Sequence, residues 1–365
     1  MAQPSGPGCA NRNTSRRGSL AVTLTIVCIA AAASSCGHSS PTAVRVPVLP
    51  TTAARGRTWE WTSACRFGPR RATGCEPSAP VLGTAQLAGN EWNLGGGPAT
   101  TGAVTMAVSP TGRVHVKGDL SDAPPCTDRS CITSQANTWV RGYPSLLYGI
   151  DQCNAKTSPP QAPALQLPMN VRSIPADMIG STTYDVEASK VTHDVAYDIW
   201  LNASDTKAPC RKSGTLEVMV WTDYDARSLL PDSLKVGTAT VPFAINGVAE
   251  PGNQAWSVYV NNVFREGRTQ PWGGTVWLVP DAAHTVGKGT VSVDLSSALA
   301  EVGALLQNNY GWRDFASNYW LDTIAFGMEF GPENADPYGA GPTDFSMDLS
   351  SYCFVVRSTV AAAAC

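Results

Sequence analysis

Short stretches with the two-residue period of β-strands recur through most of this 365-residue chain, and they restrict its fold more than any other feature. Gly, Pro, Asn and Asp, which are typical of turns, separate them. The predicted strands are 81–88, 102–108, 112–118, 138–149, 183–188, 193–201, 215–223, 236–243, 254–262, 274–279, 290–294, 319–330 and 343–356. This order predicts an all-β domain built as a two-sheet sandwich.

One segment has the period of a helix instead. Five apolar residues form a single stripe at helical spacing: Ala298, Leu299, Val302, Leu305 and Leu306. Asp294 or Ser296 is placed to cap its start, and Gly311 to end it. We expect this helix to pack on the convex back of the sandwich.

The segment Gly214–Trp221 sets a carboxylate into an apolar strand. Alternation directs Glu217, Met219 and Trp221 to one face and only aliphatic residues to the other. An acid that shares a face with a thioether and an indole is unusual for a solvated surface, although Glu is mostly exposed in proteins.

Two further strands repeat this arrangement. Within 193–201, Asp198 and Trp200 share a face, and within 319–330, Glu329 shares a face with small residues. Hydrolysis of a glycosidic bond needs an acid, a second carboxylate as nucleophile or base, and flat surfaces for sugar rings. The three strands together therefore favour a glycosidase.

The same residues carry a family resemblance. Leu216–Trp221 (Leu-Glu-Val-Met-Val-Trp) and Phe326–Phe330 (Phe-Gly-Met-Glu-Phe) resemble the two catalytic strands of family 12 glycoside hydrolases, and Tyr197–Leu201 resembles the strand whose Asp touches the nucleophile. Other segments follow in the family's order: Gly142–Gly149, Trp256–Val260 and Gly339–Gly341. The resemblance covers roughly residues 59 to 356.

This resemblance implies a concanavalin-like β-jelly roll and a retaining endo-β-1,4-glucanase or xyloglucanase activity on a β-1,4-linked glucan. No cofactor is expected. Glu217 would attack the anomeric carbon, Glu329 would be the general acid and then the base, and Asp198 would hydrogen-bond Glu217. Three residues would line the cleft, with packing as the alternative for the two Trp: Trp200, Met219 and Trp221.

Two stretches depart from the family pattern. The family's Asn-Asn-x-Trp-Gly element corresponds here to Asn90–Gly95, in which Glu91 replaces the second Asn and Trp92 is shifted by one position. We expect Asn90 and Trp92 to contact substrate. After Glu329 the family often has Pro and an aromatic residue, whereas this chain continues Phe-Gly and then offers two alternative acids: Glu333 and Asp336.

The N-terminal part predicts export. Residues 1–36 place arginines before an apolar run from Leu20 to Ala33, which is shorter than the roughly 20 residues that span a bilayer. Cys36 followed by Gly resembles a lipoprotein cleavage site, so acylation of Cys36 and simple secretion are both open. Residues 37–55 predict a flexible tether, and 56–365 the catalytic domain.

Eight of the 11 Cys remain after the export signal, and an even number in an exported chain favours disulfides. Two local pairs are expected, Cys65–Cys75 and Cys126–Cys131, and two by elimination, Cys153–Cys210 and Cys353–Cys365. No metal is expected, because C-x-x-C is absent and the four His are scattered.

Composition excludes several other function classes. The charged fraction is 15% and the net charge −3, without a basic stripe for nucleic acid. The sequence lacks G-x-S-x-G, and its run of three glycines lacks the Lys-Ser or Lys-Thr of a phosphate-binding loop. A monomer is expected, and a lectin-like surface protein on the same fold is the alternative to an enzyme.

Overall fold

The computed structural model describes residues 43–49, 59–64, 66–67, 72–73, 81–90, 103–119, 139–150, 159–203, 214–250, 255–269, 273–333, 335 and 344–365. The chain divides into two compact units, Met1–Ser40 and Pro41–Cys365, and all described residues belong to the second. The predicted export signal, Cys36 and three of the four expected disulfides lie outside the described residues.

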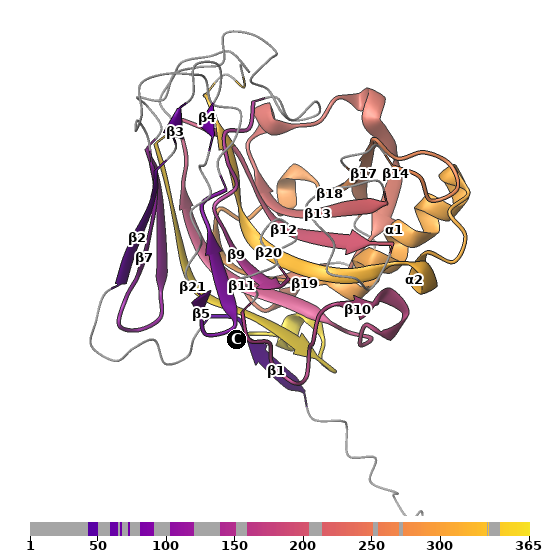
Figure 1. Ribbon diagram of the computed structural model, residues 1–365, viewed down its shortest axis with the longest axis horizontal. Helices are drawn as coiled ribbons and strands as arrows, with labels where there is room; N and C mark the ends of the chain where they lie inside the picture. Colours follow the sequence, from indigo (N-terminus) through magenta and orange to yellow (C-terminus); the bar gives the residue numbers. More distant parts are fainter. Residues whose placement is uncertain are drawn as a thin grey trace, which may run out of the picture. The chain divides into compact units, whose positions relative to one another are not determined.

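Two large β-sheets form the second unit (Figure 1). In the described part, the first sheet has nine strands, in the order β16 (Val248–Ala249), β15 (Phe243–Ile245), β19 (Lys288–Asp294), β11 (Ile179–Glu187), β21 (Phe345–Val356), β8 (Val114–Asp119), β7 (Ala103–Val108) and β2 (Trp59–Ala64), with β1 (Val44–Pro47) also on β21. The first sheet and the second sheet, described next, together form the predicted all-β sandwich, a β-jelly roll.

The second sheet has ten strands among the described residues and carries the candidate site. Its order is β14 (Lys235–Thr240), β17 (Ala255–Asn261), β18 (Gly274–Val279), β13 (Thr215–Tyr224), β12 (Thr192–Asn202), β20 (Trp320–Gly331), β9 (Ser145–Gly149), β6 (Ala85–Ala88) and β5 (Val81–Leu82), with β10 (Met169–Asn170) also on β20. A small third sheet pairs β3 (Arg66–Phe67) with β4 (Ala72–Thr73). All neighbours in the large sheets are antiparallel except β13 and β18, which run parallel.

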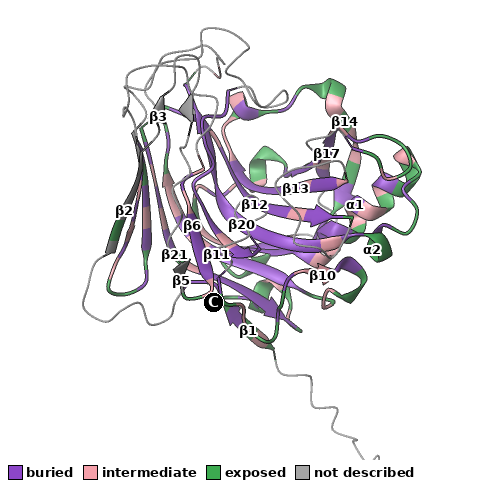
Figure 2. Cartoon of the chain, in the orientation of Figure 1, coloured by how far each residue is buried: buried purple, intermediate pink, exposed green. Residues whose placement is uncertain are grey.

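The space between the two large sheets is filled by aromatic and aliphatic side chains. The central strands that carry them are coloured as buried in the cartoon of Figure 2. Tyr197 on β12 packs edge-on against Phe326 on β20, with ring centroids 4.8 Å apart. Its hydroxyl bonds Thr182 Oγ1 on the first sheet at 2.9 Å. A buried Tyr normally satisfies its hydroxyl in this way, so this ring joins the two sheets without leaving a polar group unpaired.

The predicted helix is α1 (Leu295–Tyr310). Its stripe packs into the same core as the inner face of the second sheet, with Leu295, Ala298, Leu299, Val302 and Leu306 buried. Gly311 ends α1 in the left-handed conformation with φ 67°, which Gly adopts without strain. A four-residue helix, α2 (Phe315–Asn318), follows.

Asp294, one of the two predicted caps, begins α1. Its Oδ1 accepts from Ser297 N at 2.9 Å, and its Oδ2 accepts from Ser297 Oγ at 2.7 Å. We expect Asp294→Ala to lower the free energy of unfolding by about 1–2 kcal/mol, because it leaves helix N–H groups unsatisfied. Urea unfolding measures this, with Ser296→Ala as the matched control. A larger loss in the control would show that Asp294 is not the main cap.

The predicted tether at 37–55 is wrong for the residues that are described within it. Val44–Pro47 forms β1, antiparallel to β21, and Val46, Val48 and Leu49 are buried. The segment has the composition of a linker, but it covers the exposed edge of a long strand and thereby satisfies that strand's backbone groups.

The predicted pair Cys353–Cys365 is confirmed, with Cα atoms 5.8 Å apart. This disulfide holds the C-terminal residues against the first sheet, where Ala363 is buried in a cluster with Ile179 and Cys353. Segment 81–88 is two strands rather than one, because Gly83, at φ 63°, turns the chain. Among the described residues, no helix has the length and apolar character of a membrane-spanning segment.

Candidate active site

The three predicted carboxylate strands lie side by side in the middle of the second sheet. β12, with Asp198, is flanked by β13, with Glu217, and by β20, with Glu329. The two Glu strands are not immediate neighbours, because β12 lies between them. Their backbones are therefore about 9.6 Å apart across the sheet, twice the ordinary strand spacing of about 4.8 Å.

The side chains of each strand point to the two sides of the sheet that the alternation predicts. The aliphatic and aromatic partners of the carboxylates, such as Tyr197, Val218 and Phe326, enter the core between the sheets. Glu217, Asp198 and Glu329 point to the opposite side, which we call the site face. α1 packs with the core residues and thus lies behind the sheet, away from the site face.

Glu217 lies opposite Trp200 in the β12–β13 register. Its Oε2 accepts a hydrogen bond from Thr275 Oγ1 at 2.9 Å, across the parallel pair β13–β18. Thr275 was not predicted from the sequence, because its strand shows only an ordinary alternation. A hydroxyl donor stabilises the ionised form of a carboxylate, which is the form that a nucleophile needs.

Asp198 lies diagonally from Glu217, because it faces Met219, two residues further along β13. It is buried, and its Oδ2 accepts a hydrogen bond from Trp200 Nε1 at 2.8 Å. This bond fixes both side chains on the site face. The direct Asp198–Glu217 hydrogen bond stays a prediction.

Glu329 lies opposite Asp194 of β12, and both are buried. Tyr143, buried beside them, donates its hydroxyl to the Ala196 carbonyl at 3.0 Å. The 142–145 backbone reaches this position because residue 327 is Gly. A Cβ there would lie 2.4 Å from the Pro144 oxygen.

The electrostatics of this end of the site are dominated by buried acids. Burial, and after it the Glu329 carboxylate, raises the pKa of Asp194 well above its usual value. Burial, and after it the Asp198 charge, raises the pKa of Tyr143 well above its usual value. The phenol therefore keeps its proton at neutral pH and acts as a hydrogen-bond donor there.

The two glutamates are offset along the strands as well as across them. Glu217 faces Trp200 and Glu329 faces Asp194, so six positions of β12 separate their partners, or about 20 Å along a straight strand. β12 and β20 follow a curved path in Figure 1. Curvature and side-chain reach, rather than strand spacing, therefore set the distance between the carboxyl groups.

Comparison with known proteins gives the family. Residues 86–333 match the sequence model described as Glycosyl hydrolase family 12. The chain belongs to this family. That span contains all three carboxylate strands, so the family assignment and the site geometry concern the same residues.

Solved structures similar to this chain are also family 12 proteins, at low identity. A native xyloglucanase from Bacillus licheniformis is 15% identical, with 82% of this chain and 99% of that chain covered and a TM-score of 0.49. An endoglucanase from Rhodothermus marinus is 14% identical (75% and 92% covered, TM-score 0.45). Endoglucanase 3 from Trichoderma harzianum is 16% identical (83% and 99% covered, TM-score 0.45). A comparison with curated protein sequences returned no match.

The aromatic residues predicted to contact glucan in this family 12 chain differ in exposure. Trp200 is half-buried and keeps part of its indole accessible, whereas Trp221 is fully buried and Met219 is 2% exposed. Trp221 and Met219 pack with Tyr259, Trp277 and other residues in a cluster on the site face. In this structure Trp221 supports the site face from within rather than offering a ring to a sugar.

Asn90 lies next to the acid end of the site. Its carbonyl accepts a hydrogen bond from Tyr143 N at 2.9 Å, and its backbone has φ 52°, a conformation that Asn tolerates. Asn90 is therefore hydrogen-bonded to the backbone of Tyr143, the residue whose side chain lies beside Glu329. Trp92 lies outside the described residues.

The alternative acid Glu333 does not fit the role. Its side chain is 58% exposed and lies 3.9 Å from Arg227, whereas Glu329 is buried with Asp194. Asp336 lies outside the described residues. The departure at Gly331 has a steric cause, since a Cβ there would lie 2.1 Å from the Trp139 oxygen.

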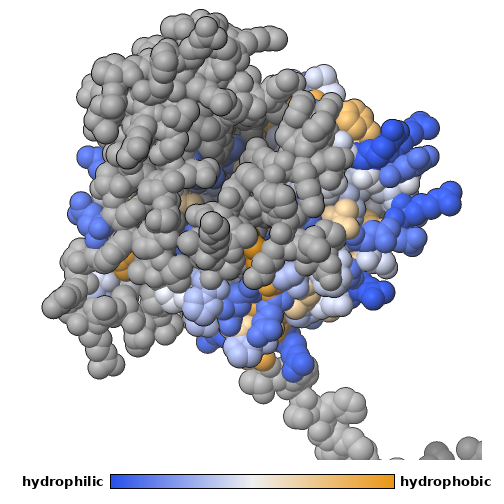
Figure 3. Space-filling view, viewed as in Figure 1, coloured by the Kyte–Doolittle hydropathy of each residue, from blue (hydrophilic) through white to orange (hydrophobic). Residues whose placement is uncertain are grey.

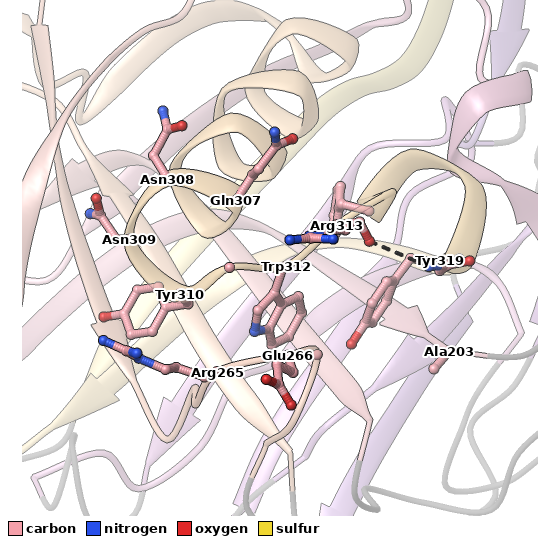
Figure 4. A pocket seen from close by; sticks show the side chains of 14 residues that line it. Ala203, Arg265, Glu266, Gln307, Asn308, Asn309, Tyr310, Trp312, Arg313 and Tyr319 are labelled. Carbon is pink, nitrogen blue, oxygen red and sulfur yellow. Dashed lines mark hydrogen bonds between the residues drawn. The ribbon is translucent and has the colours of Figure 1, made fainter. Parts of the chain in front are cut away.

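A groove of about 860 Å³ lies apart from these carboxylates, between the end of α1, α2 and the turn at 265–267 (Figure 4). Its aromatic rings pack on one another, with Trp312 and Tyr319 stacked 5.4 Å apart at 14°. Hydrophilic side chains gather on the α1 side of the molecule in Figure 3. Within the described residues no group of three or more His, Cys, Asp or Glu is placed to hold a metal ion.

Proposed function

We propose that this family 12 protein is a retaining endo-β-1,4-glucanase that hydrolyses cellulose-type β-glucans with Glu217 and Glu329. The observation that carries the proposal is the placement of both carboxylates on the site face of one sheet, with Asp198 on the strand between them. Fold alone does not separate this activity from carbohydrate binding, so the buried acids supply the argument.

The chemistry proceeds in two displacements. Glu217, with Thr275 donating to its Oε2, attacks the anomeric carbon while Glu329 gives its proton to the leaving oxygen. Glu329 then takes a proton from water, which breaks the glycosyl–Glu217 ester. Trp200, held by Asp198, offers the accessible ring on which a sugar can stack.

Reducing-sugar release from cellulose, mixed-linkage glucan and xyloglucan tests the proposal and identifies the preferred substrate. Proton NMR of the first product should show the β-anomer, because double displacement retains configuration. An initial α-anomer would contradict the mechanism. Glucan binding without sugar release would contradict the enzyme and favour the lectin-like alternative.

We further propose that the protein works outside the cytoplasm, anchored through acylated Cys36, and as a monomer. Support for export comes from the Cys353–Cys365 disulfide. Support for a monomer comes from the described surface, where the large exposed apolar side chains are scattered: Leu229, Val248 and Phe264.

Wild type is expected to partition into detergent and Cys36→Ser into the aqueous phase, because the acyl chains carried by Cys36 supply the membrane affinity. Phase separation of membrane extracts followed by detection of the protein measures this. If both proteins stay aqueous, the export signal is an ordinary one.

A further inference from the structure

Asp194 is a buried acid that the two-glutamate mechanism does not use. Its side chain is fully buried, and among the described residues neither carboxylate oxygen has a hydrogen-bond donor. An ionised carboxylate left in this way costs several kcal/mol or more. We therefore expect the Asp194 carboxyl group to hold a proton for at least part of the time.

The register supplies the partner. Asp194 and Glu329 lie directly opposite each other on β12 and β20. Side chains at such positions share a face, with Cβ atoms about 4.5–5.5 Å apart. Ionising both of two buried carboxyl groups at this distance is unfavourable, because like charges repel strongly in a low dielectric.

Several described groups around the pair either add negative charge or direct a hydrogen bond to another acceptor. Tyr143 directs its hydroxyl to a backbone carbonyl, and Asp198 and Asp223 are further acids. His193 Nε2 lies 3.6 Å from Asp223 Oδ2, so that ring is directed to the next strand. Arg141 is a buried cation near Phe330, and one guanidinium nitrogen donates to the Trp139 carbonyl.

We propose that Asp194 and Glu329 share one proton, and that Asp194 is a positioning residue which keeps the general acid supplied with it. This rests on the proposed function for its catalytic consequence. Burial, and then the Glu329 charge, raises the pKa of Asp194, which agrees with a proton held between the two groups.

The shared proton accounts for both steps of the reaction. It moves to the glycosidic oxygen as the bond between carbon and oxygen breaks and the bond from the sugar to Glu217 forms. Two carboxylates then lie side by side. When water attacks, Glu329 takes its proton, the ester breaks, and the pair returns to a single negative charge.

Asp194→Asn tests the proposal through the pH profile. The amide of Asn does not titrate, so Glu329 is the only group of the pair that can hold the proton in the variant. Glu329 then has no negative charge at position 194 to favour its protonated form. We expect the basic limb of kcat/KM on glucan to move to lower pH by about 1 unit, with kcat at the optimum reduced less than in Glu329→Ala. Asp223→Asn, a similar change of a buried acid on β13, should move the limb by far less. An unmoved or raised limb in Asp194→Asn would overturn the proposal.

A second measurement does not depend on activity. An acid whose folded pKa is raised above its usual 3.8 binds protons more tightly in the folded state, so its contribution to stability is lost as pH rises through the folded value. In Asp194→Asn this pH-dependent loss of stability is absent, because the titrating carboxyl group has been removed. The Tm of Asp194→Asn minus that of wild type should therefore increase from pH 4 to pH 8, and the infrared band of a protonated carboxyl should disappear at pH 7. A flat Tm difference with the band retained would refute the shared proton, whereas absence of glucan hydrolysis by wild type would refute only the proposed function.

Discussion

Glu217→Ala is expected to lower kcat on β-glucan by on the order of 10⁴-fold or more, the scale seen when a nucleophile is removed. The truncated side chain leaves the anomeric carbon without an attacking group, while Glu329 and the rest of the site face stay in place. The space it vacates borders Thr275, whose hydroxyl lost its acceptor and can bind a small anion. Added azide should therefore restore part of the rate and yield an α-glycosyl azide.

The matched control is Glu333→Ala. Glu333 lies in the same chain region as Glu329, but its side chain is 58% exposed and pairs with Arg227, so its removal should leave kcat nearly unchanged. Hydrolysis by Glu217→Ala at close to the wild-type rate would contradict the two-carboxylate mechanism. Loss of activity without azide rescue, in a protein that unfolds at the wild-type temperature, would move the nucleophile role to another group.

Glu329→Ala is expected to lose roughly 10²–10⁴-fold on glucan, the usual contribution of general acid–base catalysis. The loss should depend on the leaving group. A sugar alkoxide needs the proton that Glu329 supplies, whereas an aryl leaving group of low pKa departs without it. The first step on an aryl cellobioside should thus remain much closer to wild type, and azide should accelerate the second step because it needs no base.

Single-turnover rates on the two substrates separate these effects. Equal losses on glucan and on the aryl glycoside would contradict the general-acid role of Glu329. The Tm of the variant controls for damage to the core, since Glu329 lies on β20 between residues that fill the space between the sheets.

Alternation along single strands was enough to predict which side chains share a face. Glu217, Met219 and Trp221 lie together on the site face, and Leu216, Val218 and Val220 in the core, as a two-residue period requires. The stripe and cap of α1 were predicted for the same reason. Each of these features depends on neighbours within about four residues, so the sequence itself contains the information.

The order of the strands was beyond the reach of such patterns. β12 pairs with β13, its neighbour in the sequence, but its pairing with β20 joins residues more than a hundred positions apart, and no local period specifies that pairing. The roles of Thr275 and Asp194 follow from this order, because one is defined by the β13–β18 pair and the other by the residue opposite it on β20.

The N-terminal segment 43–49 and Trp221 show the same division. Val44–Pro47 has the composition of a linker and becomes a strand only because β21 leaves an edge that needs hydrogen-bond partners. The alternation of Trp221 fixed its face, but its burial depends on Tyr259 and Trp277, which arrive from β17 and β18. Sequence alone determined the residue types and their faces. Tertiary structure decided which of them meet, because strand pairing and desolvation are set by contacts between distant parts of the chain.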